Sequence, residues 1–250
     1  MDIQGKKALV TGGAKRLGNA LTLMLAGAGA EVAVHYNRSE TDAYDLCDMI
    51  CNDGGTAFPV AKDLSRKGAA EDLFGDLDAM DFFPEILINS ASIFHLERLL
   101  DSSEETFHRN LDINALVPLM LSREMAKRVD SGVVINMLDS RITDYDNLHV
   151  PYHLSKLSLF SLTRMLSEEL SPDFRFNAVA PGVILPPVGA DPSEEESWTE
   201  RMKNSNTLKR IGTAQQVCDA AEFLIRNDFV TGQIIFVDGG RHLKGSFYGL

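Results

Sequence analysis

The sequence contains few cysteines, no long uncharged apolar run and fewer basic than acidic residues. Three cysteines in 250 residues, Cys47, Cys51 and Cys218, cannot form a disulfide framework or a four-ligand zinc site. Sparse cysteine is typical of a reducing compartment, so we expect a cytoplasmic protein. No uncharged run reaches the roughly 18 apolar residues that a transmembrane helix needs, and we therefore expect no membrane partner.

The shortage of basic residues also limits the class of partner. The 24 lysines and arginines face 36 aspartates and glutamates, which gives a formal net charge of -12. A surface of this sign repels phosphate backbones, so we expect no nucleic-acid partner. The rest of the composition is that of a globular protein, because 44% hydrophobic and 24% charged residues are enough to bury a core.

Short β-rich runs alternate with longer helical stretches along the chain. Most of the runs are continuously apolar, which is typical of strands covered by helices on both faces. The seven candidate strands are 8–11, 32–36, 57–60, 86–89, 133–137, 174–180 and 234–237. This order predicts an α/β fold with a Rossmann-like, doubly wound parallel sheet of about seven strands.

No linker interrupts this alternation, so we expect a single domain over residues 1–250. The irregular segment is 183–207, which combines several prolines with an acidic run. Long loops in compact domains often cover a binding site. We therefore expect 183–207 to be a substrate-binding loop or lid.

The first candidate strand leads directly into the glycine-rich turn 11–18, which opens a helix. Glycines permit a tight turn and a close backbone approach, and a helix N-terminus offers free N–H groups to a pyrophosphate. Arg16 stands where such a turn commonly has a glycine, so we expect its guanidinium to bind phosphate or an anionic substrate edge. The candidate cofactor contacts in this turn are Gly12, Lys15, Arg16, Leu17 and Gly18.

The end of the second strand lacks the acidic residue that binds the ribose 2′-hydroxyl in NAD enzymes. His35, Arg38 and Ser39 stand there instead and could bind a 2′-phosphate, with Lys15 reaching across from the turn. The predicted cofactor is therefore NADP(H). Further cofactor contacts are expected where the third and fourth strands end, at Asp63, Leu64, Asn89 and Ala91.

Tyr152 and Lys156 are four residues apart, so they share one face of the helix that follows the fifth strand. Asp139 lies at the end of that strand. A phenol titrates near pH 10 and needs help to exchange a proton at neutral pH. Lys156 and a positive nicotinamide would lower the phenol pKa, whereas an ionised Asp139 would keep the phenol protonated. The three residues predict an acid-donating site.

Over essentially its whole length the sequence resembles the short-chain dehydrogenase/reductase family. The matching positions are the turn 11–18, Asp63, the Asn-x-Ala-Ser at 89–92, Asn114, Tyr152 with Lys156, Pro181-Gly182 and the Val-Asp-Gly-Gly at 237–240. The resemblance implies that Tyr152 donates the proton, Lys156 binds the nicotinamide ribose and Asn114 holds a water of the proton relay. It also implies cofactor contacts at Pro181 and Gly182, and a homotetramer.

Arg16 and Asp139 depart from the family, which usually has glycine and serine at these positions. Both departures occur in the pteridine reductases and the bacterial dihydromonapterin reductases, which the sequence also resembles at 15–18, 35–39, 91–94, 135–139 and 238–243. The resemblance implies that Phe94 stacks on a pterin ring and that Ser92 and Arg16 bind its polar edge. Asp139 and Tyr152 would deliver the proton to a ring nitrogen.

Two other functions remain open at this point: a generic carbonyl reductase, for instance of 3-oxoacyl thioesters, and a noncatalytic NADP(H)-binding protein. His149 and His153 have the i, i+4 spacing of a zinc-binding helix. Pro151 lies between them, no glutamate follows His149 and no third ligand is evident, so we predict no metal site.

Overall fold

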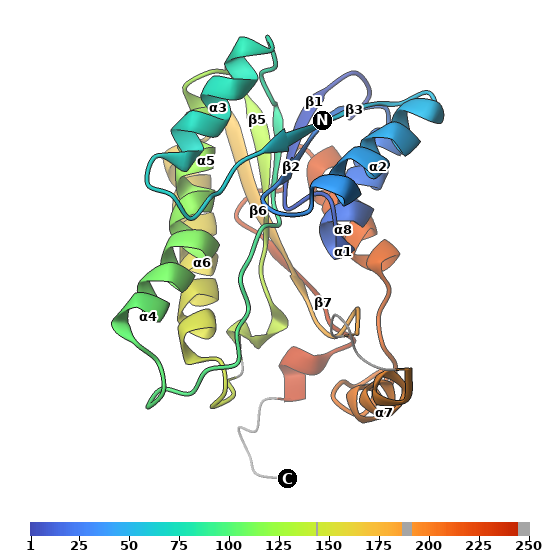
Figure 1. Cartoon of the computed structure of the whole chain (residues 1–250), viewed down its shortest axis with the longest axis vertical. Coiled ribbons are helices and arrows are strands. Elements are labelled where there is room, and N and C mark those ends of the chain that lie inside the picture. The colour runs from blue at the N-terminus through green and yellow to red at the C-terminus, as the bar shows by residue number, and fades with distance from the viewer. Residues whose placement is uncertain (144, 187–191, 245–250) are drawn as a thin grey trace.

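The computed structural model describes residues 1–143, 145–186 and 192–244, without the side chains of 192–197 and 244 (Figure 1). One parallel sheet runs through it in the order β3-β2-β1-β4-β5-β6-β7. Its strands are β1 (Lys7–Thr11), β2 (Glu31–Tyr36), β3 (Thr56–Ala61), β4 (Ile86–Asn89), β5 (Gly132–Met137), β6 (Phe174–Pro181) and β7 (Ile234–Val237). The seven predicted strands are thereby confirmed, each to within one residue at either end.

Helices cover both faces of the sheet, as continuously apolar strands require. On one side lie α1 (Arg16–Gly27), α2 (Glu40–Asn52) and α8 (Ala214–Arg226), and on the other α3 (Ala69–Ala79), α5 (Val117–Ala126) and α6 (Val150–Glu169) (Figure 1). Neighbouring strand residues face opposite sides of the sheet: Val10 belongs to the apolar core that includes α1, and Leu9 to the apolar core that includes α3. The doubly wound α/β prediction is confirmed.

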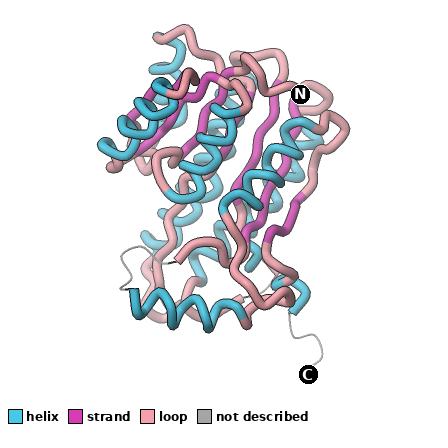
Figure 2. The backbone as a smooth tube through the Cα atoms, turned by 90° about the vertical axis from the view of Figure 1, so that its right-hand side faces the viewer, coloured by secondary structure: helices cyan, strands magenta, loops and turns pink. Residues whose placement is uncertain are grey.

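The strands are parallel, so their carboxyl ends meet at one edge of the sheet. Near this edge lie the short 3-10 helices η2 (Ser140–Ile142) and η3 (Arg241–Lys244), and helix α4 (Glu104–Leu111) continues through the π-helical turn η1 (Asp112–Leu116) into α5. Helix α7 (Pro192–Lys203) crosses in front of this end of the molecule (Figure 2). Part of the predicted lid, 187–191, lies outside the described residues.

Among the helices that the structure describes, none combines the length and the apolar character needed to cross a membrane.

Candidate active site

The glycine turn between β1 and α1 is closed so tightly that two of its positions admit no side chain. A Cβ on Gly18 would overlap the carbonyl oxygen of Gly12, and a Cβ on Gly12 would lie 3.0 Å from the Cα of Ala91. No side chain caps the N-terminus of α1. The turn therefore leaves a smooth backbone cradle in front of uncapped N–H groups, which is the surface that a pyrophosphate binds.

The ring of His35 is turned into the fold and not toward a phosphate site, contrary to the prediction for this residue. Its ring is buried, its Nδ1 accepts a hydrogen bond from the backbone N–H of Gly12 at 3.0 Å, and its Nε2 lies 3.0 Å from the carbonyl oxygen of Lys62. Because Nδ1 accepts, Nε2 carries the ring proton and donates a hydrogen bond to the carbonyl oxygen of Lys62. Burial lowers the pKa of His35 to about 4, so the ring is neutral and holds the turn against β3.

The other groups predicted to bind a 2′-phosphate lie around the start of α2. Arg38 is exposed, and Ser39 precedes the helix with its side chain free of any cap hydrogen bond. Lys15 does reach across from the turn, but to the carboxylate of Asp42 at 2.9 Å. Arg38 and Ser39 are therefore available to a 2′-phosphate, whereas Lys15 has to break its ion pair with Asp42 before it can contact one.

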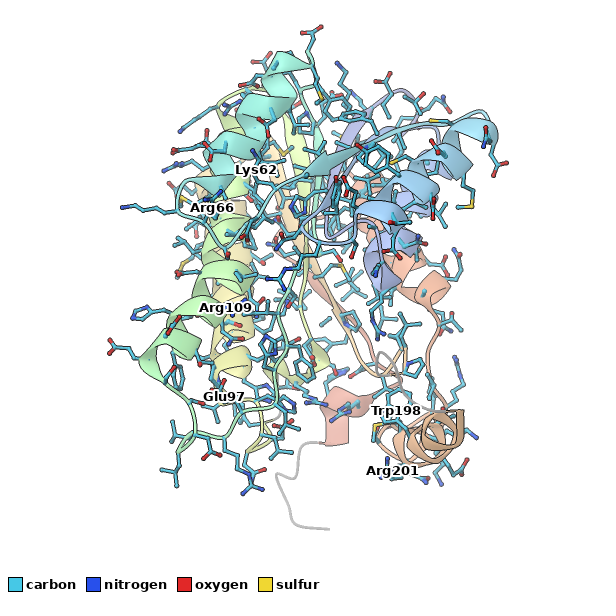
Figure 3. The ribbon with its side chains drawn as sticks, viewed as in Figure 1. Lys62, Arg66, Glu97, Arg109, Trp198 and Arg201 are labelled. Carbon is cyan, nitrogen blue, oxygen red and sulfur yellow. The ribbon has the colours of Figure 1, made fainter. Side chains whose placement is uncertain are left out.

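Asp63 follows β3, as predicted, and lies in a polar segment with Lys62 and Arg66 (Figure 3). Its Oδ1 accepts hydrogen bonds from the hydroxyl and the backbone N–H of Ser65, at 2.6 and 3.0 Å. These bonds hold the pKa of Asp63 below its usual range. The carboxylate is therefore ionised and fixed by its own loop.

The end of β4 is organised by Thr11, which the sequence analysis did not single out. Its hydroxyl oxygen accepts hydrogen bonds from the N–H groups of Ser90 and Ala91, at 3.0 and 3.1 Å. Asn89 is buried and donates to the side-chain oxygen of Asn136 at 2.8 Å, so its amide joins two strands. Asn89 thus supports the crevice from inside the sheet, and Thr11 sets the path of the segment that leads to Phe94.

Tyr152 and Asp139 are in direct contact at the carboxyl edge. The phenol oxygen of Tyr152 donates to Oδ2 of Asp139 at 3.0 Å, while Oδ1 of Asp139 accepts from the backbone N–H of Arg141 at 2.8 Å and caps η2. Burial, and then the negative charge of Asp139, hold the pKa of the Tyr152 phenol well above its ordinary value. The phenol therefore stays protonated at neutral pH and is available as an acid.

Lys156 lies one helical turn after Tyr152 and is almost completely buried. Its ammonium donates to the carbonyl oxygen of Met137 at 2.8 Å. Burial lowers the pKa of Lys156 to about 8, and the charge of Asp139 opposes this shift. At pH 7 the lysine thus keeps its charge close to the phenol, with Nζ 5.7 Å from the centre of the Tyr152 ring.

Asn114 lies in η1, where all four hydrogen-bonding positions of its amide are used. The oxygen accepts from the hydroxyl of Ser92 and the N–H of Ile93, and the nitrogen donates to the carbonyl of Ile93 and the hydroxyl of Ser155. The side chain as described has no position left for the expected relay water. Its role in this structure is to fix the segment after β4 against α6.

Phe94 lies beside the phenol with its ring 51% exposed, so it is not part of the core. Its ring centre is 4.7 Å from that of Tyr152, edge to face, and 4.4 Å from that of His149, in a stacked arrangement. Ser92, two residues earlier, is also exposed. The predicted substrate contacts Phe94, Asp139 and Tyr152 therefore do come together.

Arg16 joins the cofactor turn to the predicted lid segment. Its φ is +54°, in the left-handed region that favours glycine, and its guanidinium donates to the carbonyl oxygen of Pro186 at 2.9 Å. Gly182, which directly precedes the predicted lid segment, donates its N–H to the carbonyl oxygen of Val237 at 2.9 Å. Trp198 and Arg201 of α7 lie on the opposite side of this end of the molecule from Glu97, which follows Phe94 (Figure 3).

Helix α6 begins at Val150 with Pro151 in its first turn, so the proline does not interrupt a helix between His149 and His153. The structure also supplies a third ligating group, the carboxylate of Asp146. The two structural reasons for excluding a metal site at these histidines are therefore wrong.

Residues 12–242 match a family model described as enoyl-(acyl carrier protein) reductase. An uncharacterized oxidoreductase from Thermotoga maritima is 32% identical to this chain, over 96% of the chain and 98% of that protein. The chain belongs to the short-chain dehydrogenase/reductase family. The family prediction is confirmed. The relatives are oxidoreductases, which favours an enzyme over the noncatalytic NADP(H)-binding protein.

Two solved structures resemble this short-chain dehydrogenase/reductase closely and contain NADP. FolM alternative dihydrofolate reductase 1 from Brucella canis superposes with a TM-score of 0.89 at 31% identity, over 97% of this chain and 96% of that one. Angucycline C-6 ketoreductase LanV superposes with a TM-score of 0.88 at 28% identity, over 97% of both chains. This enzyme is an NADP-dependent oxidoreductase, as its cradle and the absence of an acid after β2 predicted.

Proposed function

We propose that this enzyme uses NADPH to reduce a C=N bond in a dihydropterin-like ring. The observation that carries the proposal is the contact of Tyr152 with Asp139, at 3.0 Å, beside the half-exposed ring of Phe94. Further support comes from the likeness to FolM alternative dihydrofolate reductase 1, because dihydrofolate contains a dihydropterin ring.

The chemistry needs one hydride and one proton, which together convert C=N to CH–NH. NADPH supplies the hydride when bound. Tyr152 supplies the proton to the ring nitrogen, because its raised pKa keeps the phenol protonated. Asp139 holds the phenol hydroxyl in place and, being half-buried, returns a proton from solvent to Tyr152 after each turnover. Lys156 binds the nicotinamide ribose in this proposal and remains fixed by the carbonyl of Met137.

The ring of the substrate would lie against Phe94. His149 stacks on this phenylalanine and the guanidinium carbon of Arg141 lies 5.9 Å from the ring centre, yet half of the surface of Phe94 is exposed. A flat, electron-poor bicycle gains from offset stacking on such a ring. We assign Ser92 and Arg16 to the polar edge of the pterin. The hydroxyl oxygen of Ser92 can accept from the ring while its proton stays bonded to Asn114, and the guanidinium of Arg16 exchanges its bond to Pro186 for the ligand.

The second candidate is reduction of a ketone, for instance in a 3-oxoacyl thioester. The likeness to angucycline C-6 ketoreductase LanV favours it. Ketone reduction uses the same hydride and the same proton from Tyr152, so the catalytic residues do not separate the two reactions. They differ in the atom that accepts the proton, which is a ring nitrogen in a dihydropterin and an oxygen in a ketone. A linear 3-oxoacyl thioester also has no ring to stack on Phe94.

The decisive experiment follows NADPH absorbance with dihydrobiopterin, dihydromonapterin and dihydrofolate, and with a panel of ketones. We expect turnover of a dihydropterin, and we expect Phe94→Ala to raise its KM by ~2- to ~12-fold, which corresponds to a lost stacking energy of ~0.5–1.5 kcal/mol. Leu96→Ala is the matched control, because Leu96 is an exposed apolar residue of the same segment. Turnover of ketones alone, unaffected by Phe94→Ala, would contradict the proposal.

A further inference from the structure

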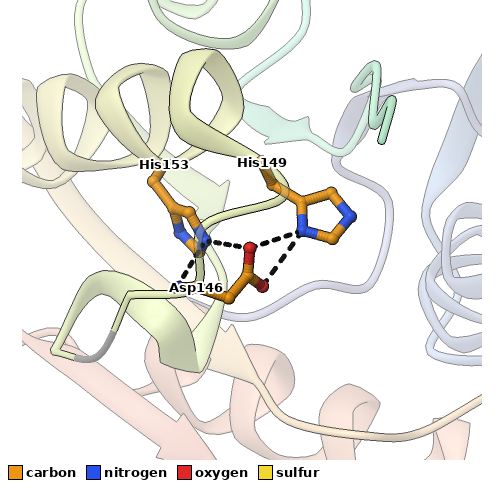
Figure 4. Close-up of side chains that lie close together, drawn as sticks. All are labelled: Asp146, His149 and His153. Carbon is orange, nitrogen blue, oxygen red and sulfur yellow. Dashed lines mark hydrogen bonds and ion pairs between the residues drawn. The ribbon is translucent and has the colours of Figure 1, made fainter. Parts of the chain in front are cut away.

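Three side chains with metal-ligating atoms converge at the start of α6 (Figure 4). Asp146 lies in the connection between η2 and α6, His149 immediately precedes the helix, and His153 follows one turn later. Nδ1 of His149 is 2.8 Å from Oδ1 of Asp146, and Nε2 of His153 is 3.6 Å from the same oxygen. All three ligating atoms lie within 4.8 Å of one another.

Hydrogen bonds hold the cluster in place, and one of them, from the backbone N–H of Asp146 to Nε2 of His153 at 3.5 Å, has to give way when this nitrogen binds an ion. Oδ1 of Asp146 also accepts from the backbone N–H of Leu148 at 2.8 Å, and Oδ2 accepts from the guanidinium of Arg141 at 2.6 Å. The side chains of His149 and His153 are 9% and 6% exposed, whereas that of Asp146 is 33% exposed. An ion can therefore enter on the aspartate side and meet two nearly buried imidazoles.

The donor set is the one that zinc-like ions select. Two imidazole nitrogens and one carboxylate oxygen, with a fourth position open to water, occur in tetrahedral Zn²⁺ sites. Bonds of ~2.0 Å in tetrahedral geometry place donor atoms ~3.3 Å apart, close to the separations around Asp146. Arg141 on the second oxygen is an outer partner that orients the carboxylate.

We propose that Asp146, His149 and His153 bind a divalent transition-metal ion of the Zn²⁺ class. On binding, the ion takes the place of the hydrogen bond between Nδ1 of His149 and Asp146, because Nδ1 must offer its lone pair to the metal while the proton of the ligating ring sits on Nε2. The ion would take no part in the reduction, but its site adjoins the active site. His149 stacks on Phe94, whose edge contacts Tyr152, so an ion that fixes His149 also fixes Phe94.

The experiment uses the untagged, metal-free, full-length enzyme and titrates it with Co²⁺ under absorbance detection. We expect one Co²⁺ per chain with the intense visible bands of a four-coordinate ion, and displacement of Co²⁺ by Zn²⁺. Asp146→Asn and His153→Gln should each weaken binding by at least ~10-fold, because each removes a ligand and loss of an outer partner alone costs that much. His108→Gln is the control, because His108 forms an exposed pair with Glu104 and should leave the titration unchanged.

NADPH binding by each variant reports whether the fold is intact. Should a variant fail to fold, anomalous scattering from a Zn²⁺-soaked wild-type crystal decides the same question. An ion within ~2.0–2.2 Å of the three ligating atoms supports the site. Only six-coordinate Co²⁺ spectra, binding that the two variants share with wild type, or a Zn²⁺ ion located elsewhere would overturn the proposal.

Discussion

Replacing Asp139 by asparagine tests the electrostatic reasoning at the centre of the site. Asparagine keeps an oxygen that accepts the hydrogen bond from Tyr152, but it removes the negative charge. Because that charge disfavours the phenolate, the Tyr152 pKa should fall in Asp139→Asn. Lys156 does not complicate the measurement, since its pKa of about 8 leaves it uncharged over most of the range in which the phenol titrates.

The size of the effect follows from the separation of the two oxygens. At 3.0 Å, two unit charges repel by ~1.4 kcal/mol in water and by ~5.5 kcal/mol at an effective dielectric constant of ~20. These energies correspond to ~1 and ~4 pKa units. Asp139 is half-buried, so the expected fall in the Tyr152 pKa lies between these limits.

The assay is a spectrophotometric titration of phenolate in the apoprotein, which contains five tyrosines. Subtracting the curve of the same protein carrying Tyr152→Phe isolates the contribution of Tyr152. Asp130→Asn, which removes an exposed carboxylate before β5, serves as the control and should leave the curve unchanged. If the isolated Tyr152 titration is the same in wild type and Asp139→Asn, the carboxylate does not control the phenol and the reasoning fails.

Three further predictions concern stability and cofactor choice. Glu124 is buried among three cations, whose hydrogen bonds outweigh burial and hold its pKa at about 2. Glu124→Gln should lower the free energy of unfolding at pH 7 by ~3 kcal/mol in urea melts. Since the Glu124 pKa is depressed from 4.5, its contribution is present above pH 4.5 and is lost toward pH 2, where variant and wild type should converge. Arg38→Ala should raise the Kd of NADPH but not of NADH. His35→Ala releases the backbone N–H of Gly12 in the turn, so it should raise the Kd of both cofactors. If Arg38→Ala raised the two Kd values equally, the 2′-phosphate assignment would be contradicted. Arg16→Gly should raise the substrate KM because it removes the guanidinium, and it should not lower stability because it also removes a left-handed backbone strain of ~1–2 kcal/mol. Lys209→Gly, at φ +52°, makes the same backbone change and should leave the kinetics unaltered.

The strands were predictable because their apolar runs are explained only by burial on both faces. The run 86–89 became β4 without a change at either end. Strands β1 and β2 begin one residue earlier than predicted, at Lys7 and Glu31, which pair with each other in the sheet. Charged residues at the amino edge extend a strand through backbone hydrogen bonds, and such bonds leave no hydrophobic signal in the sequence.

The site was predictable where spacing along a helix or position after a strand decides the geometry, as for Tyr152 and Asp139. It was not predictable where hydrogen-bond satisfaction decides the role. His35 has the residue type of a phosphate ligand, but both of its nitrogens are already bonded inside the fold. Asp146 was missed as a partner of His149 because it lies in a loop whose path no periodic pattern describes.

The pairing of Tyr152 with Asp139 also bears on the direction of the reaction. A dehydrogenase needs the phenolate as a base, whereas a reductase needs the phenol as an acid. A carboxylate placed 3.0 Å from the phenol oxygen stabilises the acid form and penalises the base. We infer that an aspartate at this position biases the enzyme toward reduction, and that the bias should decrease in Asp139→Asn as the phenolate becomes accessible. Comparison of the maximal forward and reverse rates at pH 9, each with saturating cofactor and substrate, measures this. An unchanged ratio of the two maximal rates would show that the carboxylate has another purpose.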